Sequence, residues 1–192
     1  MKKTNREKML SGELYTAFDD ELEKLHAQAA AFNDALNATA FADAKGREIL
    51  CRARFAHAGS NFTLNKPAYF DYGCHMHVGD NFYANFDCVF LDVAEIRIGD
   101  NCFLGPRVSF LTAGHPLDSV VRGEYLEFGK GITVGNDVWI GGNVVINPGV
   151  NIGDDVIIGS GAVVTKDIPA HVVAAGNPCR VLKAIDEQER SK

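Results

Sequence analysis

An aliphatic side chain recurs every six residues in the last third of the chain, and this feature limits the possible folds more than any other. From residue 134 the recurrence runs through six units without a slip, at Val134, Ile140, Ile146, Ile152, Ile158 and Val164. A second small or branched residue follows four positions later in each unit, at Val138, Val144, Val150, Val156, Ala162 and Ile168. A period of six does not match the 3.6-residue period of a helix, and it fits a short extended segment followed by a bend.

Three such segments close a triangular coil of 18 residues, and successive coils stack about 4.8 Å apart through parallel strand hydrogen bonds. The aliphatic side chains then form ladders along the axis. Gly or Asn follows most of the first-set aliphatic residues, and we interpret these as supplying the backbone freedom that each bend needs. No unit buries its ladder residue alone, so the coil must be stacked and its open end capped.

A less regular block precedes this repeat. Its ladder residues are Val78, Ala84 and Phe90, followed by a two-residue insertion and then Ile98, Leu104 and Phe110, with a second set at Phe82, Cys88, Cys102 and Val108. The ladder then breaks until Val134, because Pro116, Arg122 and Phe128 stand where aliphatic residues belong. The separation is still a multiple of six, so we expect residues 111–131 to form an extruded loop while the coil stays in phase. Long loops in compact domains are usually functional.

The rest of the chain is expected to be helical. In residues 1–58, charged residues alternate with Leu, Ala and Phe at helical spacing, and we interpret this part as a cap on the coil. Residues 59–182 form the coil with its loop, and residues 183–192 read as a short charged helix or tail. The cap helices are placed near 4–10, 19–37 and 43–57, the second one capped by Asp19 or Asp20.

Composition narrows the class of protein. The net charge is -6 and no basic block stands out, which argues against nucleic acid as a partner. No apolar run reaches the length of about 18 residues that a membrane span needs, and the basic N-terminus leads into no apolar signal core. The five cysteines, Cys51, Cys74, Cys88, Cys102 and Cys179, form no C-x-x-C pair, so neither a disulfide framework nor a zinc site is indicated. We expect reduced thiols and a cytoplasmic location, and a catalytic cysteine is the less favoured alternative.

His115 is the strongest candidate for a catalytic group. It stands between Gly114 and Pro116, where the chain leaves the coil. A neutral imidazole can accept a hydroxyl proton near neutral pH, which suits direct attack of an alcohol on a thioester. A loop histidine bonded to backbone is the simpler alternative. Three carboxylates are candidates to orient it, namely Asp92, Asp118 and Glu127.

His75 and His77 flank Met76, and strand alternation places both on one face. Such a pair could be two metal ligands, although a surface pair is the simpler interpretation.

Several motifs together resemble the maltose and galactoside O-acetyltransferases over about residues 5–185. They are Tyr72-Gly, Asn81-Phe-Tyr-Ala-Asn-Phe, Ile98-Gly-Asp-Asn, Gly114-His-Pro-Leu-Asp, Leu126-Glu-Phe-Gly-Lys, Val138-Trp-Ile-Gly, Val144-Val-Ile-Asn-Pro-Gly-Val, Val164-Thr-Lys-Asp-Ile-Pro and Ala174-Ala-Gly-Asn-Pro. The Gly-His-Pro loop with Val-Trp-Ile-Gly is far more specific than the six-residue units, which occur in many unrelated activities.

The resemblance implies a left-handed β-helix, a homotrimer with active sites between subunits, and transfer of an acetyl group from acetyl-CoA to a small sugar without a metal. It implies that His115 is the general base and that Asn85 contacts the acceptor or the developing oxyanion. It also implies a groove for acetyl-CoA at Gly142, Ser160, Thr165, Lys166, Arg180 and Lys183. The three cations among these residues suit the phosphates of CoA, and a solvated basic edge is the alternative.

Acceptor recognition departs from the galactoside pattern. That branch carries carboxylates where this chain has Ala17 and Val93, and a hydroxyl residue where Asp71 stands. Asp71 and Glu127 favour a maltose-type or glucose-like acceptor, with Asp92 nearby. Trp139 is expected beside the acceptor or at a subunit contact.

Two other functions stay open at this point. One is a metal-dependent hydratase of the trimeric β-helix carbonic-anhydrase type, which would use His75, His77 and His115. The other is a scaffold without catalysis.

Overall fold

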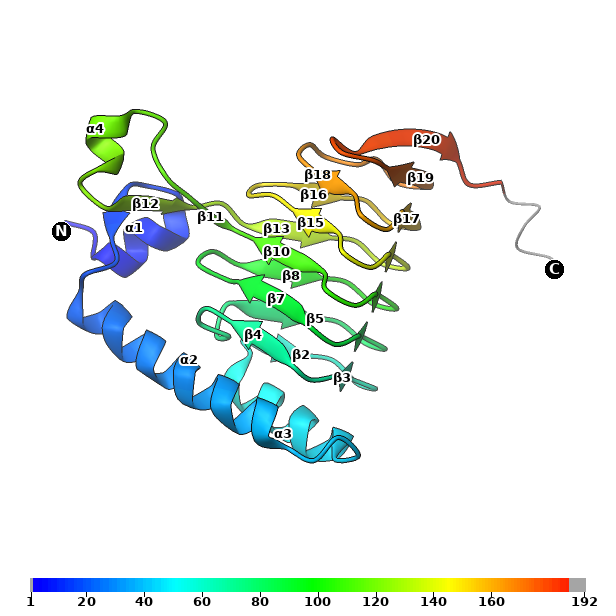
Figure 1. Ribbon diagram of the computed structural model, residues 1–192, viewed down its shortest axis with the longest axis horizontal. Coiled ribbons are helices and arrows are strands. Elements are labelled where there is room, and N and C mark those ends of the chain that lie inside the picture. The colour runs from blue at the N-terminus through cyan, green and yellow to red at the C-terminus, as the bar shows by residue number, and fades with distance from the viewer. Residues whose placement is uncertain (1, 187–192) are drawn as a thin grey trace.

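The computed structural model describes residues 2–186, and most of them wind into a parallel β-solenoid of about six turns (Figure 1). Three sheets form its walls. The first sheet holds β2 (His57–Ala58), β5 (Met76–Val78), β8 (Ile96–Ile98), β13 (Ile132–Val134) and β16 (Asn151–Ile152). The second holds β3 (Thr63–Leu64), β6 (Tyr83–Ala84), β9 (Phe103–Leu104), β14 (Trp139–Ile140), β17 (Val156–Ile158), β19 (Val172–Ala175) and β20 (Arg180–Ala184). The third holds β4 (Ala68–Phe70), β7 (Cys88–Leu91), β10 (Ser109–Leu111), β15 (Val145–Ile146) and β18 (Val163–Val164).

The ladder prediction is confirmed. Ile140 pairs with Ile158 and Ile146 with Val164, and all four side chains are buried in the core. In the third sheet the rings of Phe70, Phe90 and Phe110 stack in sequence, with centroids 4.8 and 5.4 Å apart. Each ladder residue therefore shields the one above and the one below, which is the burial that a single unit cannot provide.

The glycines that follow the ladder residues have a different role from the one expected. A Cβ at Gly99 would lie 2.7 Å from the carbonyl oxygen of Gly135 in the next turn, so these glycines permit close approach of the stacked backbones. The left-handed conformation falls two residues later, at Asn101 (φ 56°) and Asp137 (φ 58°). Asn and Asp tolerate this region better than most residues, so the bends depend on them.

All length variation among the turns falls at one corner. We call the corner between the first and second sheets the first corner, and the corner between the second and third sheets the second corner. The third corner is where the chain leaves the third sheet and enters the first sheet of the next turn. Val78 pairs with Ile98, Ile98 with Val134, and Val134 with Ile152, so turns of different length stack in register. The extra residues lie at the third corner, and the predicted loop leaves the coil there.

The loop is a hairpin rather than an irregular segment. β11 (Ala113–Gly114) pairs antiparallel with β12 (Leu126–Gly129), and α4 (Ser119–Arg122) lies between them. β1 (Tyr15–Thr16) pairs with the other edge of β12. Figure 1 shows this hairpin and α1 (Asn5–Ser11) side by side, projecting from the solenoid.

The N-terminal helices cap the first turn, as predicted. α2 (Asp20–Ala38) begins after Asp19, whose side chain accepts hydrogen bonds from the first turn, and α3 (Ala44–Arg54) ends slightly earlier than expected. Asn33 bonds both N and O of Phe70, and Asn37 bonds both N and O of Ala68, at 2.8–3.0 Å. These amides satisfy the open edge of β4 as a neighbouring strand would.

The predicted C-terminal helix is wrong in the described residues. Lys183 and Ala184 belong to β20, which pairs antiparallel with β19, while residues 187–192 of that prediction lie outside the described residues. A strand forms here because the edge of β19 needs hydrogen-bond partners. Within residues 2–186, the helices are all too short or too polar to cross a bilayer.

Candidate functional site

The hairpin at the third corner positions His115. A Cβ at Gly114 would lie 2.5 Å from the ring of Phe128, so only glycine lets β11 pack this closely on β12. His115 follows directly, and its side chain is exposed. Its Nδ1 lies 3.1 Å from the carbonyl oxygen of Leu126 on the opposite strand.

This contact determines which imidazole nitrogen can act as a base. A carbonyl oxygen only accepts hydrogen bonds, so Nδ1 must donate its proton to Leu126. In the neutral ring, Nε2 is then unprotonated and can accept a proton. None of the three carboxylates that the sequence suggested as orienting groups makes this contact; a backbone carbonyl takes that role instead.

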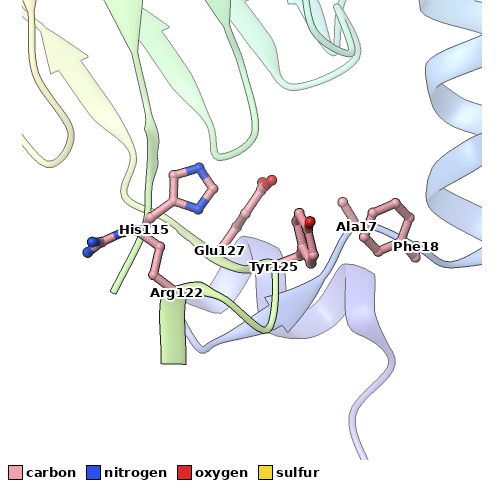
Figure 2. A pocket seen from close by; sticks show the side chains of 6 residues that line it. All are labelled: Ala17, Phe18, His115, Arg122, Tyr125 and Glu127. Carbon is pink, nitrogen blue, oxygen red and sulfur yellow. The ribbon is translucent and has the colours of Figure 1, made fainter. Parts of the chain in front are cut away.

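His115 lies on a pocket of about 270 Å³. The lining residues are Ala17, Phe18, His115, Arg122, Tyr125 and Glu127, so the N-terminal segment supplies one wall and the hairpin the other. Figure 2 shows the imidazole of His115 and the carboxylate of Glu127 pointing to the same side, while Tyr125, Ala17 and Phe18 continue the row away from His115.

Glu127 is held by a tyrosine that is distant in sequence. The hydroxyl of Tyr15 donates to Glu127 Oε2 at 2.7 Å, and Tyr15 and Glu127 are paired residues of β1 and β12. Burial, with a further contribution from Glu127, raises the pKa of Tyr15 above its usual range. The hydroxyl therefore keeps its proton and remains a donor.

Asp71 lies close enough to the carboxylate of Glu127 to interact with it electrostatically. Burial raises its pKa; His26 counteracts this, and the neighbouring carboxylates of Asp92 and Glu127 add to it. Asp71 on the solenoid is therefore close enough to Glu127 on the hairpin for the two carboxylates to interact, but only Glu127 lines the pocket.

Asp92 does not fit the acceptor role expected from the sequence. Its side chain is fully buried, and its two oxygens accept from the backbone N–H groups of Tyr72, Gly73 and His75 at 2.8–3.1 Å. Burial raises its pKa to about 6 although these donors lower it. Asp92 therefore holds the third corner together rather than facing a substrate.

Asp118 has a structural role as well. Its Oδ1 accepts from Val120 N and Val121 N and caps α4, so it does not orient His115.

His75 and His77 do not share a face. His77 points outward on β5, whereas His75 precedes the strand, is buried, and donates from Nδ1 to the carbonyl oxygen of Asp92 at 2.7 Å. Alternation fails because His75 lies in the corner and not in the strand. Among residues 2–186, no three His, Cys, Asp or Glu side chains come together as a metal site would require.

Asn85 and Trp139 lie away from the pocket within one chain. Asn85 is at the second corner, and its Oδ1 accepts from Phe86 N at 2.9 Å. Trp139 is on the outer face of the second sheet and is 55% exposed.

The residues expected to bind CoA form two groups. Lys166 and Arg180 line a second pocket, of about 230 Å³, with Asp167, Ile168, Cys179 and Val181. Thr165 directly precedes Lys166, and Lys183 is in β20. Gly142 and Ser160 lie at the second corner of adjacent turns, where Gly161 N donates to Gly142 O at 2.9 Å.

Sequence reasoning missed Tyr15, Phe18, Arg122 and Tyr125 at or beside the first pocket. Aromatic residues in otherwise polar loop segments were the available signal, but no spacing connects residues 15–18 with residues 122–127.

A stacked six-residue repeat with a capped first turn and a histidine-bearing hairpin defines the class of hexapeptide-repeat transferases. Residues 131–166 match the family described as bacterial transferase hexapeptide (six repeats), residues 8–59 match the maltose acetyltransferase hexapeptide capping motif, and residues 95–114 match the hexapeptide repeat of succinyl-transferase.

Individual relatives narrow the class. Galactoside O-acetyltransferase of Escherichia coli K12 is 40% identical over 184 residues, covering 96% of this chain and 91% of the relative. The structure of a maltose O-acetyltransferase from Clostridium difficile 630 superposes with a TM-score of 0.95 at 46% identity, covering 96% and 99% of the two chains. A galactoside acetyltransferase in complex with coenzyme A superposes with a TM-score of 0.95 at 39% identity, covering 100% and 96%. The chain belongs to the hexapeptide-repeat acetyltransferases of the maltose and galactoside O-acetyltransferase type.

Proposed function

We propose that this protein transfers the acetyl group of acetyl-CoA to a hydroxyl of a small sugar or glycoside, with His115 as the general base. The observation that carries the proposal is the Nδ1 hydrogen bond to Leu126, which leaves Nε2 as the proton acceptor on a pocket beside Glu127. Nε2 takes the hydroxyl proton as the oxygen attacks the thioester carbonyl. The C–S bond then breaks, and the proton passes to the departing thiolate of CoA. Such base assistance contributes about 10²–10⁴ in rate.

Acetyl-CoA is the expected donor, since a similar acetyltransferase is known in complex with coenzyme A. Lys166 and Arg180 share the second pocket, and their charges suit the CoA phosphates. Thr165, Lys183, Gly142 and Ser160 complete the proposed groove. Asp71 and Glu127 are proposed to accept hydrogen bonds from the hydroxyls of a maltose-type or glucose-like acceptor.

The site is proposed to be completed by a second subunit in a homotrimer. Asn85 lies at a different corner from His115, so within one chain it is not a lining residue of the pocket. The outward residues of the second sheet include Tyr83, Phe103 and Trp139 in register. The same positions of the first sheet are polar, as at His77 and Arg97. An apolar outer face of this kind favours subunit packing, which would bring a neighbour's second corner and its Asn85 amide to the pocket.

The test is an assay of CoA release from acetyl-CoA with a panel of sugars, glycosides and amines. We expect His115→Ala to lower turnover at least about a hundredfold while CoA affinity stays near normal. Lys166→Ala should weaken CoA binding more at low salt than at high salt. Equal losses of turnover and CoA affinity in the His115 variant, or an unfolded variant, would remove His115 from the catalytic role. Stoichiometric metal lost together with activity would favour the hydratase.

A further inference from the structure

The ring of Phe128 lies against the backbone of Gly114, the residue directly before His115. Gly114 and Phe128 are paired residues of β11 and β12, and a Cβ at Gly114 would lie 2.5, 2.7 and 3.3 Å from three carbon atoms of the ring. An aromatic ring that covers a glycine on the neighbouring strand shields the glycine backbone and limits its movement. Phe128 therefore occupies the space that a side chain at residue 114 would fill.

The position of the catalytic imidazole depends on this glycine. A residue without Cβ has more backbone freedom than any other, and His115 is attached directly after it. The side chain of His115 is exposed, and the hydrogen bond from its Nδ1 to Leu126 O is 3.1 Å long. An exposed hydrogen bond contributes only modestly to holding a ring in place. A restraint on the backbone of Gly114 is therefore needed to keep this bond formed.

Phe128 supplies the restraint from outside the first pocket. Side chains alternate along β12, and Glu127 lines the pocket whereas Phe128 is not among the lining residues. Figure 2 shows the imidazole of His115 on the same side as the carboxylate of Glu127. The ring of Phe128 can thus fix the hairpin backbone without occupying any of the pocket.

Lys130 connects this ring to the solenoid. Its Nζ lies 5.3 Å from the centroid of the Phe128 ring, which is a cation–π distance. Its backbone N–H donates to Thr112 O at 2.8 Å, and its carbonyl oxygen accepts from Gly149 N at 3.2 Å. Thr112 is fully buried and donates from Oγ1 to Leu91 O at 2.6 Å. The residue that holds the ring is therefore itself held by the stacked turns.

We propose that Phe128 is a positioning residue for His115. Lys130 holds the ring of Phe128, and the ring fixes the backbone of Gly114. The imidazole then keeps Nδ1 bonded to Leu126 O and Nε2 unprotonated. This inference rests on the proposed role of His115 as the general base.

The tautomer of His115 is the property that this support controls. The nitrogen that carries the proton in a neutral imidazole is set by the hydrogen bond of the other nitrogen. A histidine side chain in water prefers the tautomer with the proton on Nε2. Loss of the support should therefore place a proton on the nitrogen that has to accept one.

The experiment compares Phe128→Ala, Lys130→Met and Lys130→Arg with the unsubstituted protein. The kcat and the KM values for acetyl-CoA and for the best acceptor of the panel are measured for each. The tautomer of His115 is determined by nitrogen-15 NMR of protein labelled in the histidine rings, and the His115→Ala variant assigns the signals.

Phe62→Leu is the matched control for lost stability. Phe62 is a buried core residue that packs on Phe55 and Phe82. Reducing a buried ring to leucine should destabilise the protein about as much as removing the half-buried ring of Phe128. The control therefore changes stability without changing the hairpin.

We expect Phe128→Ala to lower kcat about 10–100-fold while both KM values change by less than about threefold. Part of His115 should change to the Nε2–H tautomer. Lys130→Met should lower kcat about two- to fivefold, whereas Lys130→Arg keeps a cation over the ring and should stay within about twofold. Phe62→Leu should lower the melting temperature but leave kcat and the tautomer unchanged below that temperature.

A compensating pair of substitutions tests the contact itself. Gly114→Ala alone should clash with the ring of Phe128 and lower kcat. Combined with Phe128→Ala, the same alanine has room, and its Cβ restricts the backbone that the ring restrained before. We therefore expect the double variant to be several-fold more active than either single variant.

The outcomes separate this proposal from the proposed reaction. An unchanged kcat and tautomer in Phe128→Ala would overturn the positioning role even if His115→Ala is inactive. The same holds for a loss of kcat without a change of tautomer, for an equal loss in Phe62→Leu, or for additive losses in the double variant. A changed tautomer in Phe128→Ala together with full turnover in His115→Ala would support the positioning contact and contradict the general base.

Discussion

Replacing Tyr15 with Phe should weaken acceptor binding without disturbing CoA. The change removes only the hydroxyl that donates to Glu127 Oε2 at 2.7 Å. A hydrogen bond to a charged group contributes about 1.5–3 kcal/mol. Glu127 is half-buried, so water replaces part of the lost bond and the lower end of this range applies. A loss of about 1.5 kcal/mol corresponds to a rise of about tenfold in the acceptor KM.

A double-mutant cycle shows whether Tyr15 acts through Glu127. Steady-state kinetics are measured for Tyr15→Phe, Glu127→Ala and the double variant, with acceptor and acetyl-CoA varied separately. We expect Tyr15→Phe to have almost no further effect when Glu127 is absent, because the hydroxyl then has no carboxylate to position. Tyr72→Phe is the control, since Tyr72 is equally buried but packs its ring on His26 at 4.4 Å.

Two results would refute this reasoning. Additive losses in the double variant would mean that Tyr15 contributes independently of Glu127. A parallel rise in the KM for acetyl-CoA would mean that the substitution disturbs the whole hairpin and does not act on Glu127 alone.

Three further predictions concern stability, pH and assembly. Alanine at both Asn33 and Asn37 removes four hydrogen bonds to β4 but improves helix propensity, so we expect the free energy of unfolding to fall by about 3 kcal/mol. The melting temperature, measured by circular dichroism, should fall by about 6–12 °C. An unchanged melting temperature would contradict the edge-capping role. Burial raises the pKa of Asp92 to about 6, above its unfolded value of about 3.9, so the folded state binds the proton more tightly. As the pH rises from 4 to above 6, the free energy of unfolding should therefore fall by about 3 kcal/mol in comparison with the Asp92→Asn variant. A relative gain over this range, in denaturant titrations, would show that the three backbone donors outweigh burial. Trp139→Glu on the second sheet should dissociate the proposed trimer, as measured by light scattering, whereas Thr133→Glu on the outer face of the first sheet should not. A trimer that persists in the Trp139→Glu variant would show that the second sheet does not form the interface.

The sequence predicted the solenoid well because its core is periodic along the chain. A ladder residue such as Ile146 needs only its counterparts one turn before and after, and a fixed interval locates them. The cap helices were also predicted, because the helical spacing of their apolar residues can be recognised within each segment. β20 was missed because its formation depends on the unpaired edge of β19, and its own residues carry charges that also suit a helix.

The candidate site was less accessible from sequence because its contacts have no common spacing. Tyr15 and Glu127 are 112 residues apart and meet only after β1 pairs with β12. Asp92 looked suitable for a substrate because carboxylates are usually exposed, and nothing local shows that three N–H groups surround it. His115 was identified because its neighbours, Gly114 and Pro116, mark the departure from the repeat.

The third corner allows the hairpin to change while the ladder residues that stabilise the fold stay fixed. Since turns of unequal length still stack in register there, residues can be added or removed at this corner without shifting a single ladder side chain. The hairpin from Ala113 to Gly129 can thus be regarded as an exchangeable module on a fixed frame. Transplanting the corresponding segment of a relative, together with residues 13–18, should carry acceptor preference with it while the frame continues to bind the acyl donor.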